Sequence, residues 1–311
     1  MKAMILAAGY GTRLRPLTDR VPKAALPFFG RPLISHTLEW LAGHGIDAAV
    51  INLHHLGAQV RAAAEAWAPR DMRLLFIDEV EILGTGGALR NARASFGDDD
   101  EIVVVNGDVF TRLDLAVALR VHRSTRAMAT LCLDAEPQHR DLFGVGLDLD
   151  KRITDFWGQP PGPEPMRRAA FTGVHITSAK LLDRLPETGF ACIKERGWIP
   201  LLRDGGHLQG VVQAAPWFDI GTPERYLAAH VGMAYDAARL SGWPMVAPFV
   251  ASAEPLPDGV TVRAPAAVGP GLRIDGPAEI GPNAFLGANV TLAAGSAVRD
   301  AVIWDGERVA G

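Results

Sequence analysis

The sequence predicts an α/β protein with a mostly parallel sheet, followed by a short parallel β-helix. Two observations support this fold. Strand-like and helix-like segments alternate over residues 1–230, and an aliphatic residue recurs every six positions from 262 to 298. The alternation indicates a sheet covered by helices on both faces, and the six-residue period is typical of a parallel β-helix. We expect domains at 1–240 and 260–311, joined by a proline-rich linker at 241–259.

Along the first 108 residues, strand-like and helix-like runs take turns. Apolar strands are expected at 1–8, 47–53, 72–79 and 101–108, and helices at 32–46, 56–67 and 86–96. Strands that are apolar throughout are typical of a parallel sheet buried on both faces. Ligands bind outside the carboxyl ends of such strands. Gly9, Asp78 and Asp108 stand at or just after strand ends, so we expect them to line one crevice.

The aliphatic repeat in the last 50 residues runs without interruption through Val262, Val268, Ile274, Ile280, Leu286, Leu292 and Val298. Each hexad would form one short strand and corner of a left-handed parallel β-helix, with its aliphatic side chain in the core. Three hexads per turn give little more than two turns, which is close to the minimum that buries a core. We therefore expect this domain to lean on the large domain or on a second subunit, which would make the protein a homo-oligomer.

The composition excludes several classes of protein. The chain has 311 residues, 48% hydrophobic and 21% charged, and a net charge of -4, which argues against a surface that coats nucleic acid. Cys132 and Cys192 are too few for a disulfide framework or a cysteine-rich zinc site, and they favour a reducing compartment. No apolar run approaches the roughly 18–20 residues of a membrane span. We expect a cytoplasmic protein with neither a membrane nor a nucleic-acid partner.

Residues 6–23, LAAGYGTRLRPLTDRVPK, join the first strand to a glycine turn. Gly9 and Gly11 match only part of a dinucleotide-binding GxGxxG pattern, because Leu14 stands at the third glycine position. No Lys-Ser or Lys-Thr follows, as a P-loop would require. Glycines still let backbone N–H groups approach a phosphate closely. Three nearby cations could neutralise such an anion, namely Arg13, Lys23 and, unless it is only a surface charge, Arg15.

This opening stretch resembles the signature of the sugar-1-phosphate nucleotidylyltransferases. Further landmarks of that family follow in the same order, namely LGTGGALRNA at 83–92, VVVNGDVF at 103–110, LFGVGLD at 142–148, FTGVHI at 171–176 and WFDIGTPERYLAA at 217–229. The resemblance covers about residues 1–230, and a hexapeptide tail also occurs in part of the family. It implies a Rossmann-like sheet of the nucleotide-diphospho-sugar transferase type. It also implies a reaction in which an NTP and a sugar 1-phosphate give an NDP-sugar and pyrophosphate.

The chemistry of that reaction explains the residue types. A phosphate monoester has a second pKa of about 6 and is already an anionic nucleophile at pH 7, so no general base is needed. The difficulty is repulsion between two polyanions, which positioning and cations overcome. The resemblance implies that Arg13 stabilises the leaving pyrophosphate and that Lys23 serves the α-phosphate and the sugar phosphate. It also implies that Asp108 and Asp219 hold Mg²⁺, which takes one or two carboxylates beside phosphate oxygens.

Further positions are implied by the resemblance alone. Those for the nucleotide are Leu6, Ala8, Gly9, Gly11, Thr12, Gly84, Thr85 and Gly86. Those for the sugar are Asn106, Gly144 and Thr172. Structural roles compete with some assignments, since Asp108 could be a turn residue and Asp219 a helix cap, although Thr222 is the better cap. His54–His55 lacks a third metal ligand, so we expect a loop role for the pair, and we expect a solvated turn at Asp98–Asp100.

The sequence departs from the family pattern at two places, and the second affects the sugar site. Many relatives carry Pro-Lys-Pro where this chain has Pro22-Lys23-Ala24, so the lysine is retained and only the second proline is lost. Many also have Glu-Lys-Pro where this chain has Gly158-Gln159-Pro160, and in them this lysine and glutamate serve the sugar phosphate and the sugar. An ammonium group is therefore missing, unless Arg167 or Arg168 replaces it.

The resemblance leaves several functions open. LGTGGAL is similar to guanylyltransferases that act on mannose 1-phosphate or heptose 1-phosphate. The missing Glu-Lys-Pro, NGDVF and the compact segment from FTGVHI to WFDIGTPE resemble N-acetylmuramate-1-phosphate uridylyltransferase. We expect GTP and mannose 1-phosphate, with the uridylyltransferase as the alternative. An acyltransferase activity of the tail is disfavoured because no histidine follows His230. A regulatory subunit that only binds a nucleotide sugar is disfavoured because it need not keep both aspartates.

Overall fold

The computed structural model describes residues 1–97 and 99–311, and these residues form two compact units. Asp98, expected in a solvated turn, lies outside the described residues. The first unit comprises Met1–Ala24 and Thr37–Asp219, and the second comprises Ala25–His36 and Ile220–Gly311. This division differs from the boundary expected near residue 240.

Contacts within the second unit explain why a short early segment joins the end of the chain. The segment carries a small hairpin, β2 (Pro27–Phe28) and β3 (Arg31–Pro32), and the later partner is helix α9 (Pro223–Gly232). The Tyr226 hydroxyl donates a hydrogen bond to the carbonyl of Pro27, and the His230 ring lies 4.6 Å from the Phe28 ring between centroids. Sequence patterns within a single helix or strand cannot reveal these contacts, because the partners stand about two hundred positions apart.

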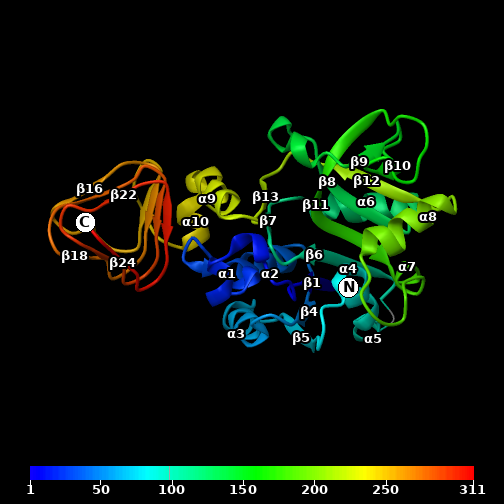
Figure 1. Ribbon diagram of the computed structural model, residues 1–311, viewed down its shortest axis with the longest axis horizontal. Helices are drawn as coiled ribbons and strands as arrows, with labels where there is room; N and C mark the ends of the chain where they lie inside the picture. The colour runs from blue at the N-terminus through cyan, green and yellow to red at the C-terminus, as the bar shows by residue number, and fades with distance from the viewer. Residues whose placement is uncertain (98) are drawn as a thin grey trace. The chain divides into compact units, whose positions relative to one another are not determined.

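The described part of the first unit contains a nine-stranded mixed sheet (Figure 1). Four neighbouring parallel strands stand in the order β6 (Glu101–Asn106), β1 (Lys2–Leu6), β4 (Ala48–Leu53) and β5 (Arg73–Asp78). These are the predicted strands, and β1, β4 and β6 are buried as expected. The residues of β5 are exposed or half-buried, because it is the edge strand.

Strand β11 (Arg167–Ser178) extends the sheet with antiparallel pairs. It pairs with β6 near its carboxyl end and with β9 (Val145–Leu147) near its amino end, and β10 (Ile153–Phe156) follows β9. The remaining strands are β8 (Ala129–Asp134), which pairs with β11, and β12 (Leu208–Val212), which pairs with β8. A separate ribbon joins β7 (Val109–Thr111) to β13 (Trp217–Asp219).

The predicted helices are present, with some breaks. The described helices of four or more residues are α1 (Leu17–Arg20), α2 (Leu33–Gly43), α3 (Gly57–Trp67), α4 (Gly84–Asn91), α5 (Arg93–Phe96), α6 (Leu115–Thr125), a 3-10 helix at Pro137–Leu142, α7 (Ala179–Leu182), a π-helix at Lys194–Trp198, α8 (Ile199–Arg203), α9 and α10 (Ala237–Ser241). The helix expected at 86–96 divides into α4 and α5. A membrane-spanning length and hydropathy are found in none of the helices that the structure describes.

The described residues of the second unit confirm the hexapeptide repeat. One sheet stacks β14 (Met245–Ala247), β15 (Val250–Ser252), β17 (Ala266–Val268), β20 (Ala284–Leu286) and β23 (Ala301–Ile303). The other two stack β16 (Val260–Val262), β19 (Ala278–Ile280) and β22 (Ala297–Val298), and β18 (Arg273–Ile274), β21 (Thr291–Leu292) and β24 (Arg308–Val309). Partners such as Ala266 and Ala284 lie three hexads apart, as expected. In Figure 1 these strands form a coil coloured orange to red.

The β-helix is longer than the repeat alone indicated. β14 and β15 lie inside the expected linker at 241–259, and β15 pairs in parallel with β17. Val250 of β15 belongs to the same buried core as Val268, Ile280 and Leu286. The linker prediction rested on proline content, which does not prevent a short strand from adding its apolar side chains to an existing core.

His175 of β11 is a buried histidine whose ring nitrogens have no hydrogen-bond partner among the described residues. Burial, with a smaller contribution from His122, lowers the pKa of His175 to about 3. The unfolded chain, with a histidine pKa of about 6.5, therefore binds a proton at pH 5 that the folded protein does not bind. The contribution of His175 to the unfolding free energy is therefore full above about pH 6.5. It is lost progressively as the pH falls from about 6.5 towards 3.

A His175→Phe variant is expected to lose about 2 kcal/mol less unfolding free energy than the wild type when the pH falls from 7 to 5. Phenylalanine suits the site because the rings of Phe171 and Trp198 lie 5.9 and 5.1 Å from His175. Urea unfolding at both pH values, followed by tryptophan fluorescence, measures the difference. Equal losses in the two proteins would show that His175 does not contribute to acid sensitivity.

Candidate active site

The glycine turn after β1 is held in place by a buried threonine. Gly11 adopts a φ of +63°, and the Thr18 hydroxyl donates a hydrogen bond of 2.9 Å to the Gly11 carbonyl. A Cβ atom at Gly11 would lie 2.8 Å from the Thr18 methyl carbon, so both the conformation and the space require glycine. Beside this turn, Thr12 and Arg13 are exposed, and Arg13 forms no ion pair with any described residue. The turn therefore presents an available cation to solvent.

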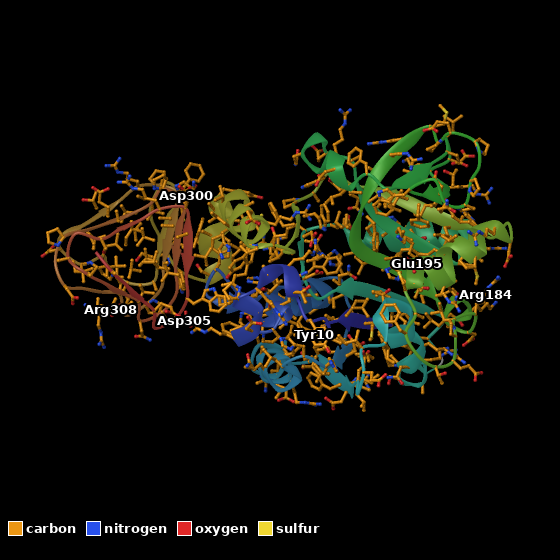
Figure 2. The ribbon with its side chains drawn as sticks, in the orientation of Figure 1. Tyr10, Arg184, Glu195, Asp300, Asp305 and Arg308 are labelled. Carbon is orange, nitrogen blue, oxygen red and sulfur yellow. The ribbon has the colours of Figure 1, made fainter. Side chains whose placement is uncertain are left out.

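The pair His54–His55 supports the same turn. His55 Nε2 donates to the Thr18 carbonyl at 2.9 Å, and His54 Nδ1 donates to the Glu79 carbonyl at 2.8 Å. The hydroxyl of Tyr10, labelled in Figure 2, lies 3.2 Å from His54 Nε2. The expected loop role of the histidine pair is confirmed. No cluster of three or more His, Cys, Asp or Glu side chains suited to a metal occurs in the described chain.

Lys23 and Asp108 meet at the carboxyl end of β6. The Lys23 ammonium donates a hydrogen bond to the Asp108 carboxylate, and the two side chains are 15% and 24% exposed. Gly107 makes this arrangement possible, since its N–H donates to the Leu6 carbonyl at 2.9 Å and a Cβ atom would lie 2.7 Å from that oxygen. The Asn106-Gly107-Asp108 turn thus packs directly against the end of β1.

The β7–β13 ribbon carries the second predicted carboxylate, Asp219. Asp219, the last residue of β13, pairs with Val109, which directly follows Asp108. The Trp217 indole fixes the ribbon, because its Nε1 donates to the Thr172 carbonyl at 2.7 Å. The register sets Asp219 opposite the residue that follows Asp108, and carboxylate oxygens are the ligands that a hard divalent cation prefers.

The GTGG segment at 84–87 is hydrogen-bonded to Ala191 and Ile193. The N–H groups of Gly86 and Gly87 donate to the Ala191 carbonyl at 2.8 and 3.1 Å, and the Thr85 hydroxyl accepts from Ile193 N–H at 2.9 Å. A Cβ atom at Gly86 would lie 3.1 Å from the same carbonyl oxygen. The Thr85 hydroxyl and the Gly86 N–H therefore already have partners within the protein.

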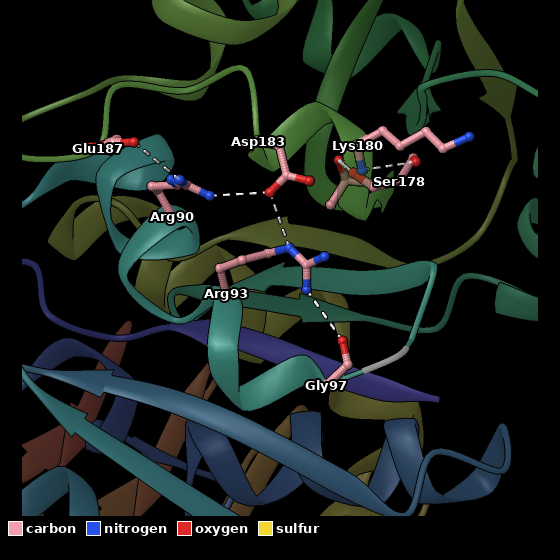
Figure 3. Close-up of polar contacts among 8 residues, drawn as sticks. Arg90, Arg93, Gly97, Ser178, Lys180, Asp183 and Glu187 are labelled. Carbon is pink, nitrogen blue, oxygen red and sulfur yellow. Dashed lines mark hydrogen bonds and ion pairs between the residues drawn. The ribbon is translucent and has the colours of Figure 1, made fainter.

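The far end of α4 is anchored by a charge cluster (Figure 3). Arg90 and Arg93 contact the same carboxylate oxygen of Asp183 at 3.1 and 3.3 Å, and Arg90 lies 3.9 Å from Glu187. Arg93 also donates to the Gly97 carbonyl at 3.2 Å. Helix α4 is thus held at both ends, which fixes the GTGG segment at its start.

The three residues assigned to the sugar lie in different surroundings. Asn106 ends β6 beside Gly173, where a Cβ atom would lie 2.9 Å from the Asn106 amide nitrogen. Thr172 is fully buried, and its hydroxyl donates to the Cys132 carbonyl at 2.8 Å. Gly144 is also buried, because the Trp157 indole lies where its Cβ atom would be. Trp157 is 60% exposed, so its ring and not Gly144 lies at the protein surface here.

A buried network that the sequence analysis missed connects the glycine turn to the GTGG segment. Asn52 accepts a hydrogen bond from Ala7 N–H at 2.8 Å and donates one to Glu79 Oε1 at 2.8 Å. The other carboxylate oxygen of Glu79 accepts from Leu83 N–H at 3.1 Å. Asp78, predicted to line the crevice, is instead 77% exposed and pairs with Arg61. Side chains alternate along a strand, so its neighbour faces inward instead.

A Glu79→Gln variant is expected to lower the unfolding free energy by about 1–3 kcal/mol, the cost of leaving a buried hydrogen-bonding group without its partner. The amide group of glutamine would face a donor, because Asn52 Nδ2 and Leu83 N–H both donate to Glu79. The matched control is Asp78→Asn, which changes an exposed carboxylate one residue away. Urea unfolding of both variants measures the effect, and equal stabilities would argue against the network.

Comparison with known proteins agrees with this fold. A family model described as "Nucleotidyl transferase" matches residues 2–235. A mannose-1-phosphate guanylyltransferase of Mycobacterium tuberculosis is 31% identical over 308 residues, which cover 99% of this chain and 80% of that protein. A UTP–glucose-1-phosphate uridylyltransferase of Synechocystis is 30% identical over 329 residues, covering 99% of this chain and 84% of the relative.

Solved structures show the same fold. HddC from Yersinia pseudotuberculosis has a TM-score of 0.62 and 24% identity, and the match covers 74% of this chain and 97% of that one. A UDP-glucose pyrophosphorylase from Acinetobacter has a TM-score of 0.64 and 21% identity, covering 78% of this chain and 95% of that one. At these identities the likeness concerns the fold alone.

Proposed function

This chain belongs to the nucleotidyl transferase family and is a sugar-1-phosphate nucleotidylyltransferase, and we propose that its substrates are GTP and mannose 1-phosphate. The observation that carries the proposal is the contact between Lys23 and Asp108 at the carboxyl end of β6, with Asp219 paired in register to Val109, the residue after Asp108. Cations and carboxylates beside a glycine turn suit a reaction between two phosphate compounds.

The choice of substrates is supported by the relatives and by the GTGG segment. Along nearly the whole chain, the relative at 31% identity is a mannose-1-phosphate guanylyltransferase. UTP with glucose 1-phosphate is the second candidate, because the Synechocystis relative is 30% identical over an equal share of the chain. The N-acetylmuramate 1-phosphate alternative rests on the missing Glu-Lys-Pro motif at Gly158-Gln159-Pro160.

Each charged residue of the candidate site has a role in this proposal. In the protein without substrate, Lys23 neutralises Asp108. When a triphosphate enters, Lys23 binds its α-phosphate together with the incoming sugar phosphate and reduces their mutual repulsion. Arg13, exposed beside the turn and without a carboxylate partner among the described residues, binds the leaving pyrophosphate.

The two aspartates suit the divalent metal that the family uses. Asp108 and Asp219 offer carboxylate oxygens, and Mg²⁺ needs one or two of these beside phosphate oxygens. We propose that they hold Mg²⁺, which when bound supplies positive charge to the triphosphate. The chain's own contribution is to position these carboxylates, through the Gly107 turn at one side and the β7–β13 ribbon at the other.

A pyrophosphate-release assay tests the proposal. GTP, UTP, dTTP, CTP and ATP are each combined with mannose, glucose and N-acetylmuramate 1-phosphates, with Mg²⁺ present or chelated. We expect the highest kcat/KM for GTP with mannose 1-phosphate and no release after chelation. A higher value for UTP with another sugar phosphate would refute the substrate choice, and unchanged activity after chelation would refute the metal role.

A further inference from the structure

A cavity of about 380 Å³ opens in the first unit between the end of β10 and the π-helix Lys194–Trp198. This volume falls within the range of about 300–1,000 Å³ that is usual for small-molecule sites. Trp157 and Gln159 line it on the β10 side, and Lys194, Glu195 and Arg203 line it on the helical side. Gln159 occupies the position where many relatives carry the lysine that serves the sugar phosphate.

Arg167 and Arg168, the two possible replacements for that lysine in the sequence, are not among the residues that line this cavity. Arg168 is engaged elsewhere, since it donates to the Asp155 carboxylate at 2.9 Å. The same carboxylate oxygen accepts from Gly158 N–H at 2.6 Å, so Arg168 stabilises the turn after β10. Arg167 is exposed at the start of β11.

Lys194 is the lysine that faces Gln159 across this space. Its ammonium lies 5.1 Å from the centre of the Trp157 ring, within the distance of a cation–π contact. It forms no ion pair with a carboxylate in the part of the chain that the structure describes. Arg203 and Glu195 contribute one charge of each sign, so the lining is net positive and suits an anion with hydroxyl groups. We propose that Lys194 binds the phosphate of the sugar 1-phosphate, an inference that rests on the proposed function.

The position of the cavity agrees with a sugar site. Ala169 of β11 pairs with Val145, which follows Gly144, and Gly173 of the same strand lies beside Asn106. These two points lie roughly 13 Å apart along the strand. On the other side, Lys194 directly follows Ile193, whose N–H is bonded to Thr85 of the GTGG segment. Lys194 is therefore held between the GTGG segment and the Trp157 side of the crevice.

The backbone on both sides of the cavity has uncommon conformations. Trp157 adopts a φ of +51°, in the left-handed region that bulky residues rarely enter. Lys194 begins a π-helix, a form found mostly as single turns at functional sites. Such conformations cost free energy and tend to persist where a binding geometry requires them. Here they place the Trp157 ring and the Lys194 ammonium against each other.

The test compares Lys194→Met with the wild type, using Lys180→Met as the matched control. Lys180 is an exposed lysine on α7, and its side chain extends away from the Arg90–Asp183 cluster (Figure 3). Calorimetry measures the binding of mannose 1-phosphate and glucose 1-phosphate, and of the two free sugars, with GTP or UTP and Mg²⁺ chelated to prevent turnover. Steady-state assays then give KM for each substrate.

We expect Lys194→Met to weaken sugar 1-phosphate binding and to raise its KM about 10- to 100-fold, as removal of one charge-assisted hydrogen bond does. Free-sugar binding and the KM of the nucleotide should stay within about twofold, and Lys194→Arg should recover most of the affinity. Unchanged sugar-phosphate binding in Lys194→Met, or no such binding in the wild type, would overturn the role of Lys194. Binding without pyrophosphate release would instead overturn the proposed function alone.

Discussion

Replacing Asp108 with asparagine is expected to lower kcat/KM by about 10²- to 10³-fold or more, the loss typical when a preorganised electrostatic contact in an active site is removed. Asparagine keeps the shape of the side chain and can still accept a hydrogen bond from Lys23. The fold should therefore survive while the charge that attracts a divalent metal is lost. Asp219→Asn is expected to have an effect of similar size, because Asp219 stands beside Val109 at the same strand end.

Pyrophosphate release measures this prediction, with urea unfolding as the check on folding. Asp78→Asn is the control, because Asp78 stands at the end of a neighbouring strand but is 77% exposed and pairs with Arg61. Its kcat/KM should stay near that of the wild type. Near-normal activity of either Asp108→Asn or Asp219→Asn would mean that the residue is not a metal ligand.

Lys23→Met is expected to lower kcat/KM by a comparable factor, about 10²- to 10³-fold, through loss of the charge that offsets repulsion between the phosphates. Methionine has a similar length and removes only the ammonium. The Lys23 side chain is only 15% exposed and contacts Asp108, so the variant removes a largely buried charge. The loss should appear in kcat as well as in KM, since both phosphates meet at this ammonium in the transition state.

Arg15→Met serves as the control for Lys23. Arg15 belongs to the same opening stretch, and its Nε lies 3.1 Å from Asp19 Oδ1 in an exposed pair. Exposed pairs contribute about 0–1 kcal/mol, so this variant should remain close to the wild type in both activity and stability. A large loss in Arg15→Met with little effect in Lys23→Met would reverse the two assignments.

Local patterns in the sequence predicted much of the fold. Apolar runs gave the positions of β1, β4 and β6, and the six-residue period located the residues that fill the β-helix core. Both patterns arise from short-range geometry, namely the side-chain alternation of strands and the corner spacing of the helix. They carry no information about contacts between distant segments, such as those that group Ala25–His36 with Ile220–Gly311.

The candidate site was predictable in outline but not in its supports. Lys23 and Asp108 stand 85 positions apart, and only the resemblance to a known family suggested that they act together; the structure brings them into contact. The only sequence signal for the Asn52–Glu79 network is that polar residues stand at the ends of apolar strands. The pleat of the strand decides which of these side chains faces inward. The contact of the Trp157 ring with Gly144 has no sequence signal, and the sugar role of Gly144 stays a prediction.

The central claim is that Asp108 and Asp219 act as one unit, holding a single metal ion beside Lys23. The most direct measurement is kcat/KM for pyrophosphate release by the two single asparagine variants and by the double variant Asp108→Asn/Asp219→Asn. If one ion needs both carboxylates, the double variant should lie within about threefold of the weaker single variant, because residues that act together lose their effect together. If the two losses multiply instead, the carboxylates act independently and the claim is wrong.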